Sequence, residues 1–79
     1  MKRSKIVLIE WVDTGVIHGW QCHDDIEDSI THCCSVGFLI KKDSEGVTIA
    51  YAMSDQGLIM ERKTIPNGCI TRIRELRVR

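Results

Sequence analysis

Two four-residue turns that end in glycine, DSEG and SDQG, divide the middle of the chain into three short apolar segments. In the central segment, VTIAYAM, large apolar residues alternate with threonine and alanine, which is the period of a strand with one face on a core. Because turns this short join neighbouring antiparallel strands, we expect a three-stranded meander. Its strands are predicted at residues 35–42, 47–53 and 58–65, with Val36, Phe38 and Ile40 sharing one face and Val47, Ile49, Tyr51 and Met53 another.

Two more strands flank this meander. Residues 5–12, KIVLIEWV, are rich in apolar and β-branched types and predict a strand buried on much of both faces. Pro66 cannot donate to a strand ladder, so it ends the third meander strand, and PNGC then forms a tight turn or one turn of 3-10 helix. A last strand follows at 69–76. We expect Ile65 and Ile70, on either side of the turn, to pack into the core.

The fold class follows from the order strand, long loop, meander, one-turn helix, strand. We predict a single all-β domain over 1–79, a small five-stranded barrel whose element order resembles that of Src-homology-type and Sm-like barrels. The long first loop, 14–34, has no clean period, although DDIEDSI suits a short helix capped by Asp24 and Asp25. A chain this short buries only about 60% of its unfolded surface, so we expect a homo-oligomer.

The compartment is predicted from the start of the chain and from its cysteines. The apolar stretch near the N-terminus is interrupted by Glu10 and is too short for a signal-peptide core, and no apolar run reaches the length that crosses a bilayer. The sequence therefore predicts a cytoplasmic protein that does not enter a membrane. Its four cysteines are expected to be reduced thiols rather than a disulfide framework.

Charge is distributed unevenly along the chain, although the net charge is zero. Residues 6–40 contain six carboxylates and no lysine or arginine, and the remainder holds all 11 basic residues. Such asymmetry predicts two differently charged faces that can orient a partner or a second copy of the chain, or that serve solubility alone. The zero net charge argues against general nucleic-acid binding, which is typical of strongly basic domains.

The segment HGWQCHDDIEDSITHCC, 18–34, concentrates possible metal ligands. Tetrahedral zinc is normally held by two pairs of Cys or His two to four residues apart, whereas the pairs here are adjacent and diverge on an extended backbone. We therefore predict no metal and no cofactor; the alternative is a zinc-stapled loop with the ligands His18, Cys22, His32 and Cys34. The acidic surroundings do not suit a reactive thiolate, so the sequence predicts no enzyme.

Two sets of residues remain as candidates for binding. The acidic loop with an aromatic anchor predicts a partner-binding site on Trp20, Asp24, Asp25, Glu27 and Asp28; the alternative for Trp20 is a lid over the core. Trp11 is expected in the core. The alternative is an oligomer in which basic side chains from adjoining copies hold an anionic nucleotide or nucleic acid, through Arg62, Arg72 and Arg74.

Most of the chain, from about residue 8 to residue 76, resembles a family of small, mostly uncharacterised proteins of tailed bacteriophages and prophages. The likeness lies in the segments WVD (11–13), GW (19–20), SVGFL (35–39), TIP (64–66) and GCI (68–70). The resemblance implies a phage origin and a non-enzymatic accessory role toward a host protein in the host cytoplasm, with interference with host defence as a setting. It implies no catalytic residues.

Overall fold

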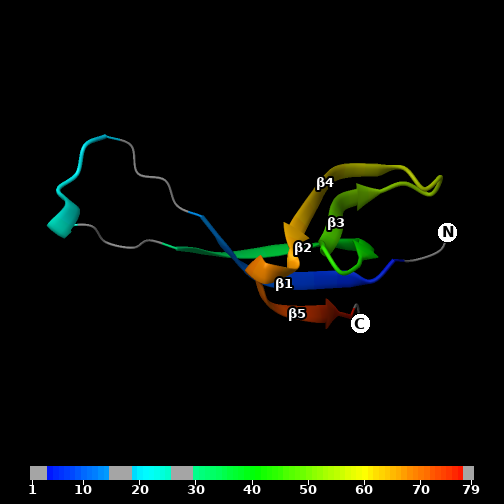
Figure 1. Cartoon of the computed structure of the whole chain (residues 1–79). Coiled ribbons are helices and arrows are strands. Elements are labelled where there is room, and N and C mark those ends of the chain that lie inside the picture. The colour runs from blue at the N-terminus through cyan, green and yellow to red at the C-terminus, as the bar shows by residue number, and fades with distance from the viewer. Residues whose placement is uncertain (1–3, 15–18, 26–29, 78–79) are drawn as a thin grey trace.

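The computed structural model describes residues 4–14, 19–25 and 30–77, which form five antiparallel strands and two single-turn 3-10 helices (Figure 1). In chain order, the elements are β1 (Ile6–Asp13), η1 (His23–Asp25), β2 (Thr31–Lys42), β3 (Gly46–Met53), β4 (Ile59–Pro66), η2 (Asn67–Cys69) and β5 (Ile70–Leu76). The five predicted strands and the 3-10 turn before the last of them are therefore confirmed. β2 begins four residues earlier than predicted, inside the expected loop.

The strands form one sheet in the order β4-β3-β2-β1-β5, and every neighbouring pair is antiparallel. The prediction of a barrel is not confirmed, because β4 and β5 remain the two edges of an open sheet. Both edges carry exposed basic residues, with Arg62 on β4 and Arg72 and Arg74 on β5. Like charges and the proline that ends β4 oppose direct pairing of these edges.

The core lies between the inner faces of the curved sheet and is small. Its buried apolar residues come from three strands, and they are Val7, Ile9, Val47, Ile49, Ala50 and Ile65. Ile70 packs against this cluster from the start of β5, as expected, and Ile65 is buried at the end of β4. The predicted core positions on β1, on β3 up to residue 50 and around the 3-10 turn are thus confirmed.

Tyr51 is an exception, because 72% of its surface is exposed although it shares the parity of Val47 and Ile49. β2 pairs with β3 only as far as the couple Phe38–Ala50, so the last residues of β3 pair with β4 alone. Tyr51 therefore lacks β2 as a neighbour, whereas Met53, two residues later, is half-buried and its Sδ accepts a hydrogen bond of 3.7 Å from the hydroxyl of Ser4.

Val36 is also exposed, because the inner positions of β2 are occupied by Ser35 and Gly37, opposite Ile9 and Val7. Small residues at these positions let β3 approach β2 closely. An added Cβ on Gly37 would lie 2.8 Å from the carbonyl oxygen of Ala50. The shared face of Val36 and Phe38 therefore lies on the outside of the sheet.

Both predicted hairpin turns are held by side chains at their first position. Asp43 accepts hydrogen bonds from the backbone N–H groups of Glu45 (2.9 Å) and Gly46 (3.1 Å). Ser54 accepts from those of Gln56 (3.2 Å) and Leu58 (3.0 Å) in the same way. Aspartate and serine favour turns because their short side chains reach these backbone donors.

Acid is expected to weaken the first of these turns. The backbone N–H groups of Glu45 and Gly46, together with Lys41, hold the pKa of Asp43 below its ordinary value of 3.8. The folded state therefore favours the ionised carboxylate, and this stabilisation is complete above the ordinary pKa and disappears as the pH falls through the lower pKa of the folded protein. We expect Asp43→Asn to lower the melting temperature at neutral pH and to flatten its pH dependence below about pH 4.

Thermal unfolding followed by circular dichroism between acidic and neutral pH measures this effect. Asp55→Asn is the matched control, because Asp55 lies in the second turn and its side chain makes no hydrogen bond among the described residues. Equal pH profiles for the two variants would contradict the role given to Asp43.

The molecule is elongated. Its radius of gyration is 16.4 Å and its extents are 56 × 26 × 21 Å, whereas a compact chain of this length has a radius of gyration of about 12 Å. Its accessible surface is 6930 Å², against roughly 4,900 Å² for a typical folded monomer of this mass. Much of this extension comes from the β1–β2 hairpin, which projects away from the other strands (Figure 1). No described helix has the length and apolar character needed to cross a membrane.

Candidate partner-binding arm

The outer part of the β1–β2 hairpin extends beyond the rest of the sheet, and we call its described residues, 12–14, 19–25 and 30–32, the arm. β5 pairs with β1 only as far as Trp11, so Val12 and Asp13 pair with β2 alone. This two-stranded stem carries η1 to the end of the molecule farthest from β3, β4 and β5 (Figure 1). Apart from Trp20, the residues of 19–25 are small or polar, so this segment has few side chains that would bury against the core.

Trp20 lies in the arm with its whole surface exposed, at 104% of the reference value. The preceding residue, Gly19, has a φ of 103°, a backbone conformation that glycine adopts without strain. Ile30, where the chain returns toward β2, is also exposed at 62%. The arm therefore presents two large apolar side chains to solvent at a distance from the core.

The predicted acidic part of the site is described in part. Asp24 is in η1 with its side chain 93% exposed, and its Oδ1 lies 3.7 Å from Nδ1 of His23. Asp25 closes η1. Glu27 and Asp28 fall outside the described residues. Asp24 and Trp20 thus lie on the same solvent-exposed segment.

The proposed zinc ligands do not form a described cluster. Cys22 is in the arm near η1, whereas His32 and Cys34 lie on β2, and His18 is outside the described residues. Among the residues that the structure describes, no three His, Cys, Asp or Glu side chains are grouped so that they could hold a metal ion. All four cysteines are free thiols.

Trp11 immediately precedes the arm; it is half-buried and packs against the core as predicted. Its Nε1 donates a hydrogen bond of 2.9 Å to the hydroxyl of Ser35, and Nζ of Lys63 lies 4.1 Å from the centre of its ring. This cation–π contact connects β4 to β1, with which it shares no ladder in the described sheet. Beside Trp11 is an open hollow of about 370 Å³, and it is lined by Glu10, Trp11, His32, Cys33, Cys34 and Thr71.

The basic candidates are separated by the width of the sheet. Arg62 is on the edge strand β4, whereas Arg72 and Arg74 are on the opposite edge strand β5. Within one chain these three side chains therefore do not form one site.

Sequence reasoning missed a second hollow, on the outer face of β2, β3 and β4. Thr48 and Thr64 meet there beside Arg62 and Lys41. The signal was present in VTIAYAM, whose small residues alternate with the core residues and leave room on that outer face.

Comparison with known proteins adds no relative to these observations. No family model matches the chain, and no curated protein and no solved structure matches it either. The likeness to phage proteins seen in the sequence therefore stays a prediction.

Proposed function

We propose that this protein is a non-enzymatic binding protein whose arm attaches to a basic surface of a macromolecular partner. The observation that carries the proposal is Trp20, an indole exposed over its whole surface on a segment that projects from the sheet. Tryptophan is among the residues that contribute most to binding energy when a partner encloses them. An arm built on a two-stranded stem positions this side chain ahead of the rest of the molecule.

The charge of the arm supports a basic protein surface as the partner. Asp13 and Asp24 are exposed, and the chain contains no lysine or arginine between residues 6 and 40. Carboxylates beside an aromatic anchor attract basic side chains and accelerate their encounter. The same charges repel the phosphates of nucleic acids, so this end of the molecule favours a protein.

The setting that we propose comes from the sequence resemblance to proteins of tailed phages. In that setting the protein acts in the host cytoplasm as an accessory factor, and a component of host defence is a suitable target. The two alternatives have less support. Binding of an anionic nucleotide or nucleic acid by three arginines requires copies of the chain to join opposite edges of the sheet, and a zinc-stapled loop requires ligands from both the arm and β2.

Trp20→Ala is expected to weaken partner binding at least tenfold without lowering the melting temperature. A tryptophan side chain that a partner encloses contributes more than about 1.4 kcal/mol to the free energy of binding, and about 1.4 kcal/mol corresponds to a tenfold change in the dissociation constant. The tagged chain is first used to capture host proteins at low salt, and the captured protein is then purified and its affinity measured by calorimetry. Binding should also weaken as salt is raised, because the carboxylates are exposed.

Tyr51→Ala is the matched control, since it removes another exposed aromatic side chain at a site away from the arm. This variant should bind like the unmodified chain. The proposal fails if no host protein is enriched, or if the purified partner binds both variants with equal affinity.

A further inference from the structure

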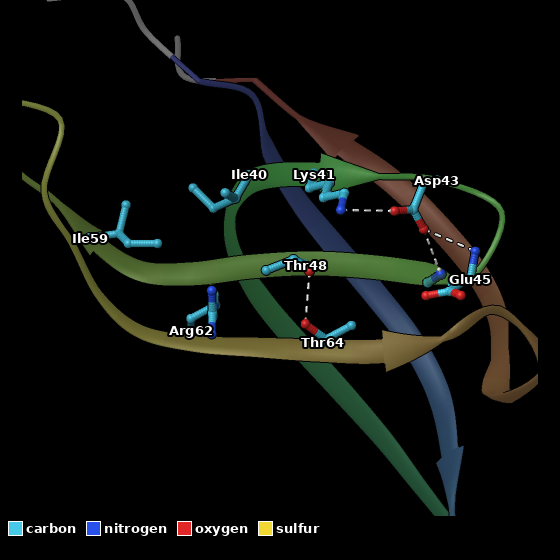
Figure 2. Close-up of a pocket in the computed structure, with 9 residues that line it drawn as sticks. Ile40, Lys41, Asp43, Glu45, Thr48, Ile59, Arg62 and Thr64 are labelled. Carbon is cyan, nitrogen blue, oxygen red and sulfur yellow. Dashed lines mark hydrogen bonds and ion pairs between the residues drawn. The ribbon is translucent and has the colours of Figure 1, made fainter.

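The hollow on the outer face of β2, β3 and β4 has the form of a small-ligand site (Figure 2). Its volume is about 330 Å³, which is at the lower end of the range for ligand pockets. It is hollow because small residues, Gly46 and Thr48, form part of its lining, and both are buried in the sheet. The longer side chains that line it come from both neighbouring strands and from the first turn, and they are Ile40, Lys41, Asp43, Glu45, Ile59 and Arg62.

Two hydroxyl groups in this hollow retain an unused donor. Thr48 is only 8% exposed, and its Oγ1 lies 2.8 Å from Oγ1 of Thr64 on the neighbouring strand. A pair of hydroxyls has two protons, and their mutual hydrogen bond uses one of them. The second proton has no acceptor among the described residues, so it is available to a ligand.

Arg62 supplies a positive charge beside these hydroxyls. It is two residues before Thr64 on β4 and therefore on the same face of the sheet. Lys41 also lines the hollow, but its Nζ is 3.2 Å from Oδ2 of Asp43, which compensates its charge. Arg62 takes part in none of the ion pairs formed by the described residues. The guanidinium is therefore the cation that is free to bind an anion.

The two ends of the hollow differ in chemistry, as Figure 2 shows. Ile40 and Ile59 lie toward one end with Arg62 beside them, the threonine pair lies in the middle, and Asp43 and Glu45 lie at the other end. The acidic end repels a ligand that carries a second anionic group away from the first. The apolar end favours a compact apolar group next to a single anionic group.

We propose that this hollow binds a small molecule that has one oxyanion, a carboxylate or a phosphate monoester, next to a compact apolar group. Arg62 and the free threonine hydroxyl hold the oxyanion, and Ile40 and Ile59 contact the apolar group. A guanidinium matches both oxyanions because it presents parallel N–H donors. This site is separate from the arm and does not depend on its function.

The test is a titration of the ¹⁵N-labelled chain followed by NMR, with phenyl phosphate, benzoate and the neutral benzyl alcohol as probes. We expect saturable shifts of the backbone amide signals of Lys41, Thr48 and Thr64 with at least one of the two anions, and none with benzyl alcohol. Tighter binding of phenyl phosphate identifies a phosphate monoester as the ligand group, and tighter binding of benzoate identifies a carboxylate. The proposal is overturned if neither anion saturates these signals at about 10 mM, ten times a dissociation constant of about 1 mM, or if the alcohol binds equally well.

Three variants locate the anion. Arg62→Gln is expected to weaken binding at least tenfold and Thr64→Val severalfold, whereas Arg72→Gln, which removes the same charge from the opposite edge of the sheet, should leave it unchanged. Thr64→Val preserves the shape of the side chain, so it tests the site even if Arg62→Gln does not fold, and the spectrum of each free variant reports its fold. Equal affinities for Arg62→Gln and Arg72→Gln would show that the anion binds elsewhere, as would undiminished affinity in Thr64→Val.

Discussion

Ile9→Ala is expected to lower the free energy of unfolding by about 2–5 kcal/mol, because it opens a cavity in a core that has few other contacts to compensate. Ile9 is completely buried in β1, where it pairs with Ser35 of β2 and Ile73 of β5. Small domains have total stabilities toward the lower end of about 5–15 kcal/mol. The substitution therefore removes a large share of the total stability, and a loss at the upper end of this range leaves a substantial fraction of the molecules unfolded at room temperature.

Urea denaturation followed by circular dichroism measures this loss. Ile30→Ala is the matched control, because it makes the same chemical change at a residue that is 62% exposed. Surface substitutions of this kind change stability by no more than about 0.5 kcal/mol. A similar loss for both variants would mean that Ile9 is not enclosed in the way that the structure shows.

Gly46→Ala is expected to cost about 1–3 kcal/mol, for a steric reason. A Cβ at this position would lie 2.6 Å from the carbonyl oxygen and 3.2 Å from the carbonyl carbon of Ile65. These are backbone atoms of the paired strand β4, and they can move only if the strands separate. Because Gly46 is not among the residues with positive φ, the cost arises from this close approach and not from backbone torsion.

The corresponding control is Gly68→Ala in η2, where an added Cβ has no atom within 4 Å. Alanine has less conformational freedom than glycine in the unfolded chain, so less entropy is lost on folding. The stability of this variant should therefore be unchanged or slightly higher. The difference is measured by thermal unfolding, in which each 1 kcal/mol shifts the melting temperature of a domain of this size by about 4–8 °C. Equal melting temperatures for the two glycine variants would contradict the strand approach described here.

Local sequence patterns predicted the elements correctly where turn residues and apolar alternation agree. Asp43 and Gly46 mark one hairpin, and the structure shows the hydrogen bonds by which Asp43 holds it. Pro66 ends β4 and η2 follows it at once. These features depend on residues within a few positions of one another, so they can be read without knowledge of the whole fold.

Assignments that depend on what covers a strand were less accurate. The alternation of β3 predicted Tyr51 in the core beside Val47 and Ile49, but β2 ends its pairing before Tyr51 is reached. On β2, apolar alternation drew attention to Val36, whereas the inner positions there are Ser35 and Gly37. The alternation of residues along a strand indicates which residues share a face. It does not indicate which face, or how much of it, is covered by other strands.

The sequence by itself determined five strands, the two tight turns, the one-turn helix before the last strand and the unequal distribution of charge. Only the tertiary structure decided that the sheet stays open, that the arm projects with Trp20 fully exposed, and that Arg62 lies beside two threonine hydroxyls while Arg72 and Arg74 lie on the opposite edge. The reason is physical: backbone torsions and turn hydrogen bonds are local, whereas burial and the meeting of side chains from different strands depend on the register and curvature of the sheet.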